Sequence, residues 1–160
     1  MIMTRFSTSL IMALTCISLQ AAALPAKELE HHTLAQLLLD ASRNKADAAR
    51  DEARKPADVM YFSEISSGDY VLDLFAGGGW YTELFSLAVG EKGKVYAQND
   101  NVIWQFAEKG ITERTKNNRL ANVTRLDKIE IADMKVADKS VDLVFTALNY
   151  HDLFFTHSVR

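Results

Sequence analysis

The fold of this chain is decided by one stretch, Val71-Leu72-Asp73-Leu74-Phe75-Ala76-Gly77-Gly78-Gly79-Trp80-Tyr81-Thr82-Glu83. Its first residues form a short apolar run, which is typical of a strand in a parallel sheet covered on both faces. The three consecutive glycines allow a sharp turn and let a ligand approach the backbone without a Cβ in the way. The residues after the glycines begin a helix, whose free N–H groups face that ligand. Strand, glycine turn and helix in this order predict a nucleotide-type site; a tight turn without a ligand is the alternative.

Two residues of this stretch separate two kinds of nucleotide site. The dinucleotide fingerprint G-x-G-x-x-G requires a third glycine for close helix–strand packing, but Thr82 stands in that place. The spacing Asp73-x-x-x-Gly77-x-Gly79 instead resembles motif I of the class I S-adenosylmethionine-dependent methyltransferases. The resemblance implies that Asp73 holds the amino acid end of the cofactor, which carries an ammonium near a sulfonium. A carboxylate attracts these cations, whereas it would repel the pyrophosphate of a dinucleotide.

Strands alternate with helices along the rest of the chain. We expect a strand over residues 71–74, a helix over 81–89, a strand over 94–98 and a helix over 101–116. Two more strands are expected at 123–126 and 141–148. This alternation predicts an α/β fold with a doubly wound, Rossmann-like parallel sheet. A length of 160 residues suits a single domain of this kind.

The amino-terminal residues 1–23 differ from the rest of the chain. Arg5 is the only charge before Lys27, and an apolar stretch follows it and ends in Ala21-Ala22-Ala23. This pattern predicts a cleavable signal peptide, and hence a periplasmic or secreted protein with no stable membrane anchor. The polar residues within the stretch disfavour an uncleaved membrane anchor, and a lipoprotein attached through Cys16 is a weaker alternative still. Cleavage would leave a mature chain without cysteine.

The segment between the signal peptide and the first strand is expected to be helical, over residues 24–62. We expect one helix over residues 34–53 and a second that begins at Pro56, since proline suits the first turn of a helix. The charged residues of 47–55 form either a solvated helix face or a cover for the cofactor or substrate. His31 and His32 are adjacent and not spaced as metal ligands, so we expect them to be solvated and predict no metal site.

Several blocks of the chain are similar to a family of exported, predicted bacterial methyltransferases. They are residues 52–62, 77–83, 94–99 and 149–152, which appear in the order found in that family. The resemblance names methyl transfer as the reaction but no acceptor. It also implies a class I sheet of about seven strands in the order 3-2-1-4-5-7-6. Because the chain reaches only the fourth, we expect an incomplete, carboxyl-terminally truncated sheet over residues 63–160.

The resemblance also implies a set of cofactor-binding residues. Asn99 stands where the family usually has an acid for both ribose hydroxyls, and Asp100 beside it is a second candidate; both are also common turn formers. Glu130 is expected to accept from the adenine amine, with Asp127 as its rival, and Ile131 to offer its N–H to the ring. The full set is Asp73, Ala76, Gly77, Gly78, Gly79, Thr82, Asn99, Asp100, Glu130 and Ile131.

The candidate catalytic residues Asn149, Tyr150 and His151 follow the fourth strand. Ligands bind at the carboxyl edge of open α/β sheets, where these residues are expected to lie. His151 is the natural base if the methyl acceptor must lose a proton; the alternative is that it merely ends the strand. Asn149 and Tyr150 are suited to orient an amine or hydroxyl acceptor.

The sequence therefore predicts transfer of a methyl group from S-adenosylmethionine to an unknown acceptor, expected to be a small molecule. The net charge of −3 and the lack of a basic run give no support for a nucleic-acid partner. The motif at residues 149–152 is not of the Asn-Pro-Pro-Tyr type, which disfavours a DNA adenine. The alternatives are a catalytically incompetent ligand-binding fragment and a nicotinamide-dependent oxidoreductase.

Overall fold

A parallel sheet forms the centre of the structure, a computed structural model that describes residues 29–154. Its strands are β1 (Tyr70–Leu74), β2 (Lys94–Asn99), β3 (Val123–Asp127) and β4 (Leu143–Phe145), in the order β3-β2-β1-β4. Every neighbouring pair is parallel. The expected α/β fold with a parallel sheet is thus confirmed. The predicted signal peptide lies outside the described residues.

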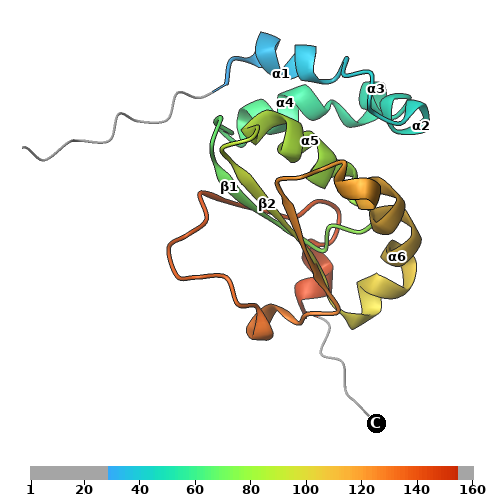
Figure 1. Cartoon of the computed structure of the whole chain (residues 1–160), viewed down its shortest axis with the longest axis vertical. Helices are drawn as coiled ribbons and strands as arrows, with labels where there is room; N and C mark the ends of the chain where they lie inside the picture. Colours follow the sequence, from blue (N-terminus) through green and yellow to red (C-terminus); the bar gives the residue numbers. More distant parts are fainter. Residues whose placement is uncertain (1–28, 155–160) are drawn as a thin grey trace, which may run out of the picture.

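The main helices lie on one side of the sheet (Figure 1). They are α1 (His31–Leu37), α4 (Pro56–Phe62), α5 (Trp80–Val89) and α6 (Asn101–Thr115). Two single-turn helices, α2 (Lys45–Ala48) and α3 (Asp51–Arg54), connect α1 to α4. Among the described residues, no helix combines the length and the apolar character that crossing a membrane requires.

The core lies between these helices and one face of the sheet. Val71 of β1 is paired with Val95 of β2, and both side chains are fully buried. They pack with Phe85 of α5, while Leu34 of α1 and Met60 of α4 close the same cluster. Because alternate residues of a strand point to opposite faces, this register directs the apolar side chains of 71 and 95 toward the helices.

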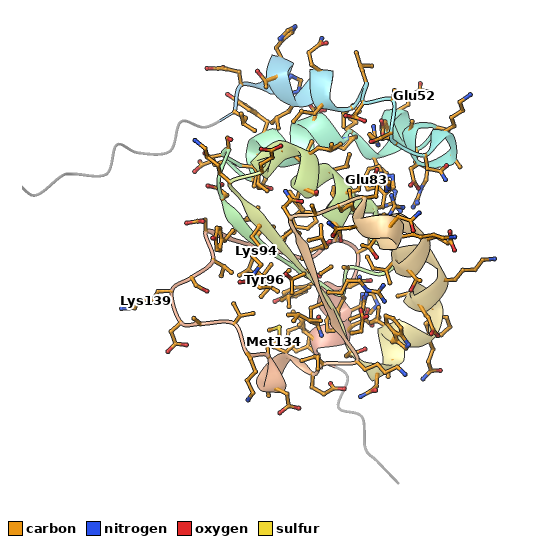
Figure 2. The ribbon with its side chains drawn as sticks, in the orientation of Figure 1. Glu52, Glu83, Lys94, Tyr96, Met134 and Lys139 are labelled. Carbon is orange, nitrogen blue, oxygen red and sulfur yellow. The ribbon has the colours of Figure 1, made fainter. Side chains whose placement is uncertain are left out.

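The opposite face of the sheet carries a connection instead of helices. Residues 128–142 run from β3 to β4 on this side, with only the short 3₁₀ turn η2 (Ile131–Asp133) within them. Figure 2 shows Lys94 and Tyr96 on the side of Met134 and Lys139, whereas Glu83 lies among the helices. Val144 of β4 belongs to the same face and is 55% exposed. This face is therefore only partly covered by the described residues.

One predicted helix is wrong. Residues 34–53 do not form a continuous helix, because α1 ends at Leu37 and turns separate it from α2 and α3. Side chains compete with the helical backbone here: Asp40 accepts from Ser42 N–H, and Asn44 accepts from Ala46 N–H. The buried Arg43 folds back to donate to the Leu38 carbonyl. The bonds of Asp40 and Arg43 lie in the turn after α1, and the Asn44 bond caps the start of α2, so the segment divides even though its apolar spacing favours one helix.

The fourth strand is shorter than expected. The apolar run predicts a strand over 141–148, but β4 contains only Leu143–Phe145. β4 pairs with β1, which ends at Leu74, and the next residue, Phe75, turns away with a φ of +53°. Asn149 then donates from Nδ2 to the Phe75 carbonyl, which fastens the segment after β4 to this turn. The ladder is therefore limited by the length of its partner strand.

Candidate functional site

Two small cavities lie beside the glycine turn, at the carboxyl edge of the sheet. The first, about 260 Å³, is named here the arginine cavity. Of the predicted site residues it is lined by Asp73, Ala76, Gly77, Gly78 and Asn149. The second, about 220 Å³, is the Asp100 cavity, lined by Asp100, Glu130, Ile131, Ala132, Asp152 and Leu153. Phe75 lines both cavities, so they adjoin at the turn after β1.

Asp73, the last residue but one of β1, carries a buried carboxyl group and is only 3% exposed. Its Oδ2 accepts a hydrogen bond of 2.6 Å from the Thr82 hydroxyl, so Thr82 orients Asp73 without lining the cavity itself. Burial raises the pKa of the Asp73 carboxyl to about 7, because a buried carboxylate loses its hydration, and the bonds from Thr82 offset this only in part. A cation in the arginine cavity would stabilise the ionised form.

The three glycines of the turn have different uses. A Cβ on Gly77 would meet no atom within 4 Å, so this residue leaves open space where it lines the cavity. A Cβ on Gly79 would lie 2.5 Å from Ile111 Cδ1, and a Cβ on Gly78 would lie 3.6 Å from the Gly110 Cα. Gly78 and Gly79 thus allow α6 to approach the turn. In the sequence, Gly110 is the residue that could have indicated this close contact, since an isolated glycine inside a helix usually has a packing reason.

Asn99 braces the glycine turn. Its side chain is fully buried, with Oδ1 accepting from Gly77 N–H at 2.8 Å and Nδ2 donating to the Gly77 carbonyl at 3.2 Å. The Oδ1 and Nδ2 of Asn99 thus each bond to the backbone of Gly77, and its predicted use on ribose stays a prediction. The neighbouring Asp100 caps α6, because its Oδ1 accepts from the N–H groups of Val102 and Ile103. Asp100 is also the member of the pair that lines a cavity.

Glu130 and Ile131, the two residues predicted for the adenine, both line the Asp100 cavity. Glu130 Oε1 accepts from Asn101 Nδ2 at 3.1 Å. The rival residue, Asp127, forms an ion pair of 2.6 Å with Arg125 and is not part of this lining. Geometry therefore favours Glu130 over Asp127.

The structure separates the three candidate catalytic residues. Asn149 lines the arginine cavity. Tyr150 and His151 begin the 3₁₀ turn η3 (Tyr150–Phe154), which directs them outward, and neither lines either cavity. Tyr150 is 67% exposed and packs edge-on against Phe154, and His151 Nε2 lies 3.3 Å from Asp152 Oδ1.

Several residues of the arginine cavity are not predicted by the motif. Arg50 and Arg54 come from the segment of α2 and α3, and Trp80 and Tyr81 from the start of α5. Burial raises the pKa of the Tyr81 hydroxyl above its usual value, which keeps it protonated at neutral pH. The charged stretch 47–55 was the only sequence signal for the arginines. Of its two readings, the geometry favours a cover for the site.

A network of ion pairs centred on Arg114 of α6 fixes the glycine turn. Arg114 of α6 donates from Nε to the Gly78 carbonyl at 2.8 Å and pairs with Asp47 at 2.6 Å and with Glu83. Glu83, whose side chain is 2% exposed, also pairs with Arg119 at 2.6 Å. The network joins α2, α5 and α6 to the turn, so the shape of the cavity depends on all three helices.

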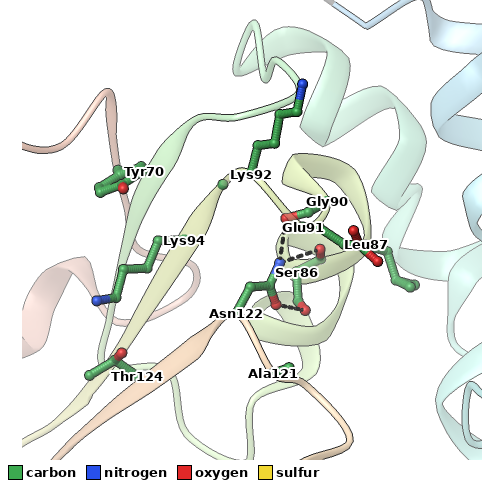
Figure 3. Close-up of a pocket in the computed structure, with 11 residues that line it drawn as sticks. Tyr70, Ser86, Leu87, Gly90, Glu91, Lys92, Lys94, Ala121, Asn122 and Thr124 are labelled. Carbon is green, nitrogen blue, oxygen red and sulfur yellow. Dashed lines mark hydrogen bonds between the residues drawn. The ribbon is translucent and has the colours of Figure 1, made fainter.

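A wider cavity of about 650 Å³ lies at the opposite, amino edge of the strands (Figure 3). Its polar side chains bond to one another: Ser86 donates to Asn122 Oδ1 at 2.5 Å, and Asn122 Nδ2 donates to the Ser86 and Gly90 carbonyls. These bonds fasten the start of β3 to the end of α5. Since ligands of open α/β sheets bind at the carboxyl edge, this cavity is not the candidate site.

The comparisons with known proteins give a match in fold. No protein-family model matches the chain, and no curated protein is similar to it. Among solved structures, it resembles an S-adenosylmethionine-dependent methyltransferase from Aquifex aeolicus, with 28% identity and a TM-score of 0.56 over 80% of this chain. It also matches an O-methyltransferase of this class from Thermotoga maritima, with 25% identity and a TM-score of 0.48 over 58% of this chain and 34% of that one.

The structure therefore has a Rossmann-like fold of the methyltransferase type. The order β3-β2-β1-β4 agrees with the first four strands of the order expected for class I. The match covers 62% of the Aquifex protein, so this chain spans about three-fifths of that protein's length.

Proposed function

We propose that this protein is a class I methyltransferase that uses S-adenosylmethionine. One observation carries the proposal: the buried carboxyl of Asp73 and the backbone of Gly77 line the same cavity, and there is free space beside Gly77. The first suits a cationic amino acid end, and the second allows a ligand to lie against the backbone. The fold of the Aquifex methyltransferase supports the same reading.

The residues present fit such a cofactor. The arginine cavity suits an amino acid, since Asp73 complements an ammonium and the guanidinium groups of Arg50 and Arg54 complement a carboxylate. The Asp100 cavity suits a nucleoside, with Asp100 for ribose hydroxyls and Glu130 for an exocyclic amine. Phe75 connects the two cavities, as a ligand with an amino acid end and a nucleoside end requires.

The bound cofactor would supply an electrophilic methyl group on a sulfonium, and the protein's residues position the acceptor. Positioning does most of the work in such an in-line displacement. Tyr81 offers a protonated hydroxyl in the arginine cavity. Asn149 is oriented there by its bond to the Phe75 carbonyl. His151, outside the cavity lining, stays a predicted base for acceptors that lose a proton.

The proposal extends to the location of the protein. Residues 1–23 are proposed to be a cleaved signal peptide, on the apolar stretch that ends in Ala21-Ala22-Ala23. The mature protein would then act in the periplasm or outside the cell, on a small-molecule acceptor.

Calorimetric titration with S-adenosylhomocysteine and with NAD tests the proposal. We expect S-adenosylhomocysteine to bind and NAD to bind at least about tenfold more weakly, because NAD offers no ammonium to Asp73 and Thr82 stands in place of the third glycine of the dinucleotide fingerprint. Gly77→Ala should weaken binding by about tenfold, because the new methyl group occupies the open space that the ligand needs. Tight binding of NAD alone would refute the methyltransferase proposal.

Gly68→Ala is a matched control for Gly77→Ala. Gly68 also has a positive φ, +94°, and a Cβ on it would also meet no atom within 4 Å, but it lies outside both cavities. Both substitutions place a Cβ on a residue with a positive φ, and Gly68→Ala should leave the affinity for S-adenosylhomocysteine within about twofold of the wild-type value. Equal losses in both variants would show that strain, and not the ligand's contact with Gly77, is responsible.

A further inference from the structure

The arginine cavity holds more positive charge than its own residues neutralise. Three arginines line it: Arg50, Arg54 and Arg114. Arg114 is neutralised, because it pairs with both Asp47 and Glu83. Arg50 has one ion pair with Asp47, at the long distance of 3.9 Å, and the described residues provide no carboxylate within ion-pair distance of Arg54. Arg50 and Arg54 are therefore the cations that a ligand can use.

Trp80 fixes these two arginines beside the site. The Arg54 guanidinium carbon lies 5.0 Å from the centre of the indole ring, and that of Arg50 lies 5.6 Å from it. The indole is itself held by its Nε1, which donates to the Asp47 carbonyl at 3.3 Å. Stacking of this kind restricts the guanidinium groups before a ligand arrives, so less side-chain freedom is lost on binding.

The proposed cofactor leaves part of this charge unused. Its amino acid end carries one carboxylate, which can occupy one guanidinium, while its ammonium and sulfonium add positive charge against the single carboxyl of Asp73. A positive excess remains beside the methyl group that is to be transferred. Two like charges held close together in a partly buried cavity favour an additional anion.

We propose that the methyl acceptor is a small molecule with a carboxylate or phosphate group, and that Arg50 and Arg54, stacked on Trp80, share their N–H donors between the carboxylate of the cofactor and this group. The inference rests on the proposed function. Guanidinium forks match the geometry of both anions and can bind them through two parallel hydrogen bonds. The cavity volume of about 260 Å³ restricts the part of the acceptor inside it to a few heavy atoms beyond the amino acid end of the cofactor.

The test uses the protein saturated with S-adenosylhomocysteine, so that the cofactor's carboxylate is already in place. Inorganic phosphate, acetate and the neutral acetamide are titrated separately and followed by calorimetry. We expect phosphate or acetate to bind, acetamide to fail, and Arg54→Gln and Arg50→Gln each to weaken anion binding by about tenfold. If phosphate binds more tightly than acetate, the acceptor carries a phosphate group. If acetate binds more tightly, the acceptor carries a carboxylate. Arg54→Lys keeps the positive charge but loses the two parallel N–H donors. Its affinity for the anion should therefore lie between that of the wild type and that of Arg54→Gln.

Lys139→Gln is the matched control, since it removes one positive charge from an exposed position on the connection to β4, away from the cavity (Figure 2). Lys139→Gln should leave the affinity for the anion within about twofold of the wild-type value. If S-adenosylhomocysteine does not bind the wild-type protein, the proposed function fails, and this inference fails with it. If it binds but both arginine variants bind anions as the wild type does, the acceptor inference alone is overturned.

Discussion

At the scale of single residues, Asp73 is the most informative group in the site. Its carboxyl lies at the end of β1, almost fully buried, with the Thr82 hydroxyl as its hydrogen-bond donor. Burial raises the pKa of Asp73 to about 7, so the charge of the arginine cavity changes near neutral pH. The proposed ligand needs the ionised form, because its ammonium pairs with a carboxylate and not with a neutral acid.

The affinity for S-adenosylhomocysteine should therefore depend on pH. We expect it to be constant above pH 7 and to fall by about tenfold for each unit below it, because binding to the protonated protein must first release the proton of Asp73. Calorimetry at several pH values measures this. In Asp73→Asn the affinity should be low and lack this dependence, and a wild-type affinity that is unchanged at acidic pH would contradict the assignment.

The same pKa predicts the effect of Asp73 on stability. The pKa rises from the ordinary value of 3.8 to about 7 on folding, so the folded state binds more protons than the unfolded state. The contribution of Asp73 to the free energy of unfolding is thus greatest below pH 3.8 and is lost as the pH rises through 7. Urea denaturation should show this decline in the wild type and not in Asp73→Asn.

At the scale of elements, the contact between α6 and the glycine turn shapes the site. Gly110 allows the backbone of α6 to approach Gly78, and Arg114 of the same helix donates to the Gly78 carbonyl. Arg114 also neutralises Glu83 of α5 and Asp47 of α2. One side chain thereby connects three helices to the turn, and its loss would leave a buried carboxylate short of a partner.

Arg114→Leu should lower the free energy of unfolding by roughly 3 kcal/mol, because Glu83 and Asp47 lose a buried cation. Lys116→Gln is the control: Lys116 pairs with Glu113 at 3.7 Å, but both side chains are more than 60% exposed (61% and 65%). Its loss should cost less than about 1 kcal/mol, as expected for a surface ion pair. Similar values for the two variants in urea denaturation would mean that the Arg114 network contributes no more than a surface pair.

At the scale of the whole molecule, the two faces of the sheet are unequal. The helices cover one face (Figure 1), and the residues on it, such as Val71 and Val95, are fully buried. Of the described residues, the connection 128–142 lies on the other face, and Val144 on that face is 55% exposed. Val144 is therefore expected to contribute less to stability than the fully buried valines on the helical side.

The same substitution on the two faces tests this difference. Val95→Ala should lower the free energy of unfolding by about 2 kcal/mol, because it removes buried methyl groups and leaves a cavity. Val144→Ala removes the same atoms from a half-exposed position and should cost less than about 1 kcal/mol. An equal loss would show that the face of β4 is covered in the full chain, a result that urea denaturation of both variants detects.

Local chemistry explains which elements could be predicted. A glycine turn between an apolar strand and a helix has few alternative conformations, so β1, the turn and α5 follow from neighbouring residues alone. The segment 34–53 shows the limit of such reasoning, since its apolar spacing favours a helix. Bonds from Asp40, Arg43 and Asn44 to nearby backbone break it.

The sequence by itself determined the α/β alternation, the parallel order and the position of Asp73 beside the glycine turn, because these depend on local periodicity and on spacing along the chain. Only the tertiary structure decided which distant side chains join them. It brings Arg50 and Arg54 over Trp80 into the arginine cavity and directs Tyr150 and His151 away from it. The physical reason is that the arginines are placed by the packing of α2 and α3 against α5 and α6, a long-range contact that no local pattern encodes.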